Sequence, residues 1–86
     1  MTEEDIQEFT AALAARYLQV QEEYRWRSRR FIVMDEANTP ADDYKRALIS
    51  AEHAFAKWAL FNDVIRQLPL DVKLAFNTQL KLLRAK

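Results

Sequence analysis

The sequence has no glycine and no cysteine among its 86 residues, and only two prolines. Glycine makes up ~7% of average sequences and supplies the positive φ angles of tight hairpin turns and phosphate-binding loops. Its absence argues against a β-sheet fold and against a loop that cradles a nucleotide. The absence of cysteine excludes disulfide bonds and thiol chemistry.

Long hydrophobic runs are also missing, since the longest cover only a few residues and ~20 are needed to span a bilayer. Residues 1–5 are acidic, whereas a secretory signal peptide begins with basic residues. Half of the residues are hydrophobic and 30% are charged, a balance typical of globular proteins. We therefore expect a soluble, cytoplasmic protein with one small domain over residues 1–86.

The first segment has the periodicity of a long helix. Bulky residues recur at steps of three and four, or at twice that spacing, in the set Ile6, Leu13, Tyr17, Val20, Tyr24, Phe31 and Met34. This stripe has the spacing of a coiled coil and predicts a helix over residues 3–36. Thr2 and Asp5 have the spacing of a capping box, which predicts that the helix begins directly after Thr2.

A second helix is predicted over residues 40–67. Asn38-Thr39-Pro40 forms a loop, and Pro40 suits the first position of a helix. Thr39 and Asp42 then predict a second capping box. One face of this helix carries its main apolar set, namely Tyr44, Ala47, Leu48, Ala51, Phe55, Trp58, Phe61 and Ile65. Because the loop is short, we expect the first two helices to pack as antiparallel neighbours.

The second helix has another face, nearly opposite Phe55, on which Ile49, His53, Leu60 and Val64 fall together. Two apolar faces require two partner surfaces. Pro69 ends the helix, and Asp71 predicts the cap of a third helix over residues 71–84. That helix places Val72, Phe76, Leu80 and Leu83 on one side, flanked by Leu74 and Leu82. Either this helix or another subunit can cover the second face.

The predicted fold is therefore all-α, an antiparallel hairpin of two long helices plus a shorter C-terminal helix in a small helical bundle. The first helix is about twice as long as the third, so a single third helix cannot cover the whole hairpin. An uncovered apolar seam predicts a homodimer, the commonest closed assembly. The small side chains of residues 11–15 predict the place where the third helix or a second subunit crosses the first.

Residues 24–31 interleave four arginines with aromatic side chains, a composition typical of surfaces that bind phosphates and stack on bases. At about 100° per residue, Arg25 and Arg29 point one way and Arg27 and Arg30 another, so they form a collar and no single patch. The chain is neutral overall, whereas nucleic-acid-binding domains tend to be basic. We interpret the collar as solvated, or as a site for an acidic protein partner.

His53 is the only histidine, with Ser50 one helical turn before it and Glu52 beside it. A serine–histidine pair can be drawn from this spacing, but no glycine-rich elbow or oxyanion hole accompanies it. A second histidine, any cysteine and a Glu-x-x-His spacing are also missing, which argues against a metal site. We predict no catalytic residue, no metal and no cofactor, and interpret His53 as an interface or surface residue.

The sequence thus predicts a non-enzymatic protein–protein interaction module of the adaptor, regulator or co-chaperone type. The residues expected to make the interaction share an aromatic, arginine or outward-facing apolar character and are Arg25, Trp26, Arg29, Arg30, Ile49, His53, Leu60 and Val64. The alternative is a nucleic-acid-binding regulator that uses residues 25–30. An enzyme or small-ligand binder is a third, weaker hypothesis.

Overall fold

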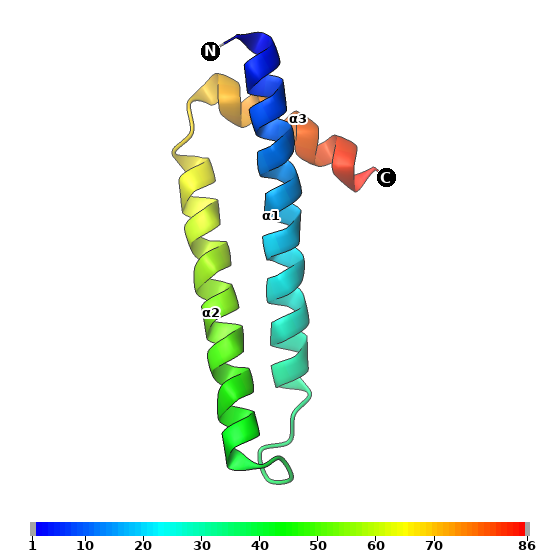
Figure 1. The fold of residues 1–86 in the computed structure, drawn as a ribbon, viewed down its shortest axis with the longest axis vertical. Helices are drawn as coiled ribbons and strands as arrows, with labels where there is room; N and C mark the ends of the chain where they lie inside the picture. Colours follow the sequence, from blue (N-terminus) through cyan, green and yellow to red (C-terminus); the bar gives the residue numbers. More distant parts are fainter. Residues whose placement is uncertain (1, 86) are drawn as a thin grey trace.

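The computed structural model describes residues 2–85, and within this range it contains three α-helices and no strand. They are α1 (Glu3–Ile32), α2 (Ala41–Arg66) and α3 (Leu70–Arg84). Figure 1 shows α1 and α2 side by side in opposite directions, while α3 crosses α1 in its N-terminal half. The prediction of an all-α hairpin with a shorter third helix is confirmed.

α1 begins at the predicted capping box. The Asp5 amide donates to the Thr2 hydroxyl oxygen at 3.1 Å, and the Thr2 amide donates to the Asp5 carboxylate at 3.2 Å. The helix ends at Ile32, four residues before the predicted end. Asp35 explains the early end, because its carboxylate accepts hydrogen bonds from the amide of Ala37 and the side chain of Asn38. Such local bonds compete with helical backbone bonds.

The other two helices begin without the predicted side-chain caps. The residue before α2 is Pro40 and the residue before α3 is Pro69, and neither makes a side-chain capping bond. The predicted capping box of Thr39 and Asp42 and the predicted cap at Asp71 are therefore wrong. Both prolines take an extended ψ with a φ of −53°, so the ring geometry itself directs the chain into each helix.

Aromatic pairs join α1 to α2 along the hairpin. The ring centroids lie 6.0 Å apart for Tyr17 and Phe61, 5.5 Å for Tyr24 and Trp58, and 5.1 Å for Phe31 and Tyr44. The residue numbers on α2 decrease as those on α1 increase, so the two helices are antiparallel in this register. The rings in these pairs supply large apolar contact areas and tilted or stacked packing between the two helices.

Phe55 does not occupy the core position predicted for it, because 52% of its surface is exposed. The centre of the α1-facing surface is formed by the small residues Ala51 and Ala54, which are buried and let the two helices approach closely. Phe55 lies at the edge of this surface, with its ring 5.6 Å from that of Tyr24. Trp58 is half-buried, in agreement with its predicted place on the α1-facing surface.

α3 packs on α1, and its buried face is the predicted one. Phe76 is 3% exposed and Leu80 is buried, and both cluster with Ala14, whose exposure is 0%. The ring of Phe76 also meets Tyr17 edge-on at 5.6 Å. The small side chain of Ala14 lets α3 come close, so the prediction that residues 11–15 mark a crossing point is confirmed. The sequence left open whether α3 or another subunit covers the second face of α2. Because α3 packs on α1, it does not cover that face.

Candidate functional site

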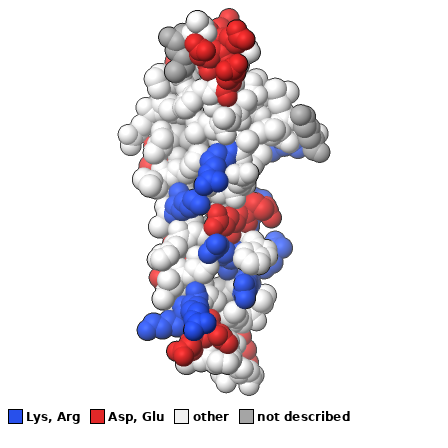
Figure 2. Space-filling model, in the orientation of Figure 1, with Lys and Arg blue, Asp and Glu red and all other residues white. Residues whose placement is uncertain are grey.

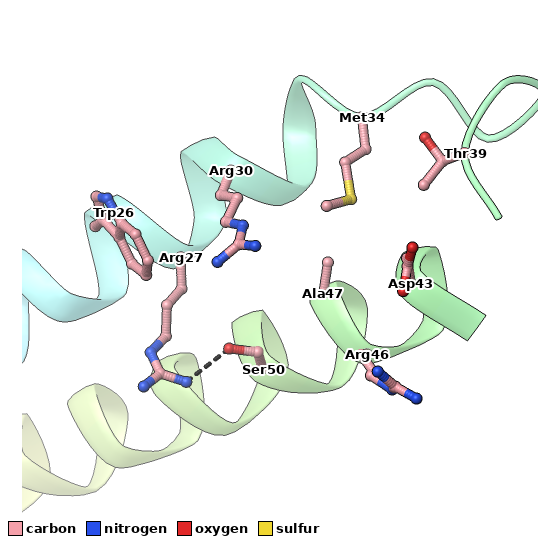
Figure 3. Close-up of a pocket in the computed structure, with 9 residues that line it drawn as sticks. All are labelled: Trp26, Arg27, Arg30, Met34, Thr39, Asp43, Arg46, Ala47 and Ser50. Carbon is pink, nitrogen blue, oxygen red and sulfur yellow. Dashed lines mark hydrogen bonds between the residues drawn. The ribbon is translucent and has the colours of Figure 1, made fainter. Parts of the chain in front are cut away.

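The arginine collar divides between two sides of α1. Arg27 and Arg30 extend toward α2 (Figure 3). Arg25 lies on another side, where it borders a shallow hollow together with Arg84 of α3. Arg29 is exposed. The structure therefore brings Arg30 together with Trp26 and with residues of α2, and it separates these from Arg25.

Arg27 links the two long helices. Its Nη1 donates a 2.6 Å hydrogen bond to the Ser50 hydroxyl oxygen on α2, and its Nη2 lies 3.1 Å from the Glu23 carboxylate on α1. Glu23 also accepts from Lys57 of α2 at 3.4 Å. The Glu23 carboxylate lies one turn earlier than Arg27 on the same helix, at the i, i+4 spacing of an ordinary intrahelical pair. The charge of Arg27 is thereby paired, and its position is fixed.

Trp26 and Arg30 form an exposed stacked pair. The Arg30 guanidinium carbon lies 5.5 Å from the centre of the Trp26 ring, within the range of a cation–π interaction. Trp26 is not part of the apolar stripe of α1, and 58% of its surface remains exposed. An exposed tryptophan beside an arginine presents a flat apolar surface and a hydrogen-bond donor at the same place.

These side chains line a pocket of about 430 Å³ between the C-terminal part of α1 and the first turns of α2. We call it the arginine pocket, and its lining consists of Trp26, Arg27, Arg30, Met34, Thr39, Asp43, Arg46, Ala47 and Ser50 (Figure 3). Sequence reasoning did not include Arg46. The hairpin register could have identified it, because Arg27 meets Ser50 and Phe31 meets Tyr44, which places Arg46 at the same level along the hairpin as Arg30.

The outer face of α2 is the second candidate site, defined by Ile49, His53, Ala56, Leu60 and Val64. All five are exposed. Of the three large apolar side chains, Ile49 is 42% exposed, Leu60 65% and Val64 51%. This face points away from α1, and α3 does not cover it because α3 packs on α1. The chain thus leaves a helical apolar stripe without a partner in the part that the structure describes.

Charged side chains of both signs lie on the face of the molecule shown in Figure 2. Figure 2 shows acidic side chains at the N-terminal tip of α1 and Lys and Arg farther along the molecule, with acidic groups among them. No continuous basic strip covers the face shown. This arrangement favours local contacts with a partner over long-range attraction of a polyanion.

The serine–histidine pair gains no support from the geometry. The Ser50 hydroxyl accepts its hydrogen bond from Arg27, and within residues 2–85 none joins Ser50 to the exposed His53. Across that same range no group of three or more acidic or histidine side chains could hold a metal ion. None of the helices described has the length and apolar character needed to cross a membrane.

Comparisons with protein families, with curated proteins and with solved structures gave no match for this chain.

Proposed function

We propose that this chain is a non-enzymatic interaction module of the adaptor or regulator type that pairs with a second copy through the outer face of α2. The observation that carries the proposal is the exposure of Ile49, Leu60 and Val64 on one side of a helix whose other side is already packed. Exposed apolar patches bordered by polar residues are a common mark of protein interfaces.

The spacing of this face suits another helix. Its residues follow one another at steps of four, three, four and four from Ile49 to Val64, close to the repeat of a coiled-coil seam. A helical partner can therefore lie along the whole face, with side chains of each helix between those of the other. A globular partner with a flat apolar patch would use this length less completely.

The outer face is also complementary to itself in an antiparallel arrangement. With Ala56 near the two-fold axis, Ile49 of one copy opposes Val64 of the other, and His53 opposes Leu60. The small Ala56 side chain lets the two helices approach closely at the centre. A parallel arrangement would instead place Arg46 against Arg46 and His53 against His53, so the antiparallel pair is favoured.

Solution mass by light scattering tests this proposal. We expect the parent to have the mass of a dimer, and the double change Leu60→Glu and Val64→Glu to halve that mass while the helical circular dichroism is retained. Leu82→Glu is the control, because Leu82 is also an exposed leucine, lies on α3 and is outside the face. A parent that remains monomeric at high concentration, or a double variant that remains dimeric, contradicts pairing through this face.

Nucleic-acid binding is the second candidate function, and the observation that favours it is the exposed stack of Trp26 and Arg30, since aromatic and arginine planes also stack on bases. Retention on heparin or DNA at increasing salt separates the two functions, because phosphate contacts weaken steeply as salt rises. We expect weak retention that disappears below physiological salt. Strong retention at physiological salt supports the nucleic-acid function instead.

A further inference from the structure

The arginine pocket contains two guanidinium groups that lack a carboxylate partner. Arg27 is paired with Glu23 at 3.1 Å, but no ion pair within 4.0 Å involves Arg30 or Arg46 among residues 2–85. Arg30 instead lies against the Trp26 ring. Asp43 contributes the single carboxylate of the lining, so the pocket as a whole has an excess of positive charge.

We propose that the arginine pocket binds an acidic segment of a protein, with carboxylates at Arg30 and Arg46 and a neighbouring apolar side chain against Trp26 and Met34. This inference rests on the proposed function in one respect, that the ligand is a protein, and it names the chemistry of that ligand. The pocket shares no residue with the outer face of α2, although Arg46 lies next to Ile49 along the same side of the helix.

The donors of the pocket suit carboxylates. Each guanidinium presents a planar fork of N–H groups that can pair with both oxygens of a carboxylate. The pocket also includes Thr39 and Asp43, so it lies beside the first turn of α2, where the backbone N–H groups carry a partial positive charge. Pro40, which precedes that turn, provides no side-chain acceptor. The carboxylates of Asp42 and Asp43 in that turn offset this charge, so the attraction for an anionic group comes chiefly from the arginines.

The other lining residues favour a peptide over a nucleic acid. Asp43 lies among the arginines and would repel a closely packed series of phosphates, whereas separate carboxylates can be placed away from it. Trp26, Met34 and Ala47 supply an apolar wall that suits an aliphatic side chain. A volume of about 430 Å³ accommodates a few side chains, in the usual range of ligand pockets.

Contacts at both ends hold the pocket open before a ligand binds. The 2.6 Å bond from Arg27 to Ser50 fixes one end, and the tilted rings of Phe31 and Tyr44, 5.1 Å apart, fix the helix separation near the other. Because these contacts already exist, an incoming peptide has to order few side chains of this protein, chiefly Arg30 and Arg46. Preorganisation of this kind raises affinity by lowering the entropy cost of binding.

The test uses the full chain and a capped peptide in which two glutamates flank a leucine. Calorimetry gives the affinity, and Trp26 fluorescence reports the site, because a ligand at Arg30 changes the surroundings of the adjacent ring. We expect saturable binding at low salt that weakens at least tenfold when Arg30→Gln and Arg46→Gln are combined. The same peptide with glutamines in place of glutamates should bind at least tenfold more weakly to the parent.

The matched control combines Arg16→Gln and Arg66→Gln. It also removes one positive charge from each long helix, at exposed positions outside the pocket, and should leave the affinity within twofold. Circular dichroism checks that all variants remain folded. A third variant, with Arg25→Gln and Arg29→Gln, locates the site: if it loses binding while the Arg30 and Arg46 variant retains it, the pocket is the wrong place.

Other outcomes also overturn the inference. These are the absence of peptide binding at millimolar concentration, equal loss in the Arg16 and Arg66 control, and inorganic phosphate or single-stranded DNA binding more tightly than the peptide. Light scattering on the same samples separates this inference from the proposed function. A dimer that ignores the peptide contradicts only the pocket, and a monomer that binds it contradicts only the pairing through α2.

Discussion

Arg27 of α1 donates a 2.6 Å hydrogen bond to the Ser50 hydroxyl oxygen of α2, and this is the shortest side-chain bond between the two helices in the part of the chain that the structure describes. The same guanidinium is paired with Glu23, yet its Nε is buried without a partner. Arg27 therefore joins the helices while one of its donors is unsatisfied, and the cost of that donor offsets part of the gain.

We predict that a single change at this contact lowers stability more than a double change does. Ser50→Ala removes the acceptor of a charged donor and should lower the free energy of unfolding by about 1–2 kcal/mol. Combining Ser50→Ala with Arg27→Leu removes the acceptor together with the donor and its unsatisfied Nε, so the double change should be close to neutral, because replacing both partners of a polar contact by apolar groups costs little. Urea denaturation measures both. Thr78→Ala, which removes an exposed bond within α3, is the control and should change little.

A second prediction compares two phenylalanines. Phe76→Ala should lower the free energy of unfolding by about 3–5 kcal/mol, because Phe76 is 3% exposed in the cluster with Ala14. Phe55→Ala should cost well under half as much, because half of that side chain is already in water. Thermal or urea melts of the two variants give the comparison directly. Equal losses would contradict the exposure of Phe55.

A third prediction compares the capping box observed at α1 with the one that was predicted at α2 and is not formed. Thr2→Ala should lower the free energy of unfolding by about 1 kcal/mol, since the Thr2 hydroxyl accepts the Asp5 amide at 3.1 Å. Thr39→Ala should change it by less than about 0.5 kcal/mol, because the residue before α2 is Pro40 and no capping bond is made there. Chemical denaturation of both variants is the measurement. A larger loss for Thr39→Ala than for Thr2→Ala contradicts the observed caps.

Periodicity predicted the helices and the buried face of α3, because both depend on patterns within one segment. The four-residue spacing of Val72, Phe76 and Leu80 is enough to predict that these side chains are buried together. The end of α1 was missed by four residues because the local hydrogen bonds of Asp35 compete with the helix. The spacing of apolar residues does not reveal such a side-chain hydrogen bond.

The packing partner of α3 could not be predicted in the same way. Its apolar face fits either the outer face of α2 or the surface around Ala14, and the choice depends on how close the two backbones can approach. The exposure of Phe55 has a related cause, since spacing alone does not say which residue lies at the centre of a helix interface. The pairing of Arg30 with Arg46 in one pocket needed the hairpin register, which the sequence pattern left open.

The packing of α3 on α1 has a consequence for synthesis on the ribosome. α1 and α2 are joined by a short loop and can pair as soon as both have emerged, whereas Ala14 must wait for Phe76. During this interval the surface around Ala14, including the side of Tyr17 that meets Phe76, is uncovered and available to chaperones or to neighbouring nascent chains. Translation of residues 70–84 is thus the step that closes this surface, and pausing before it prolongs the vulnerable interval.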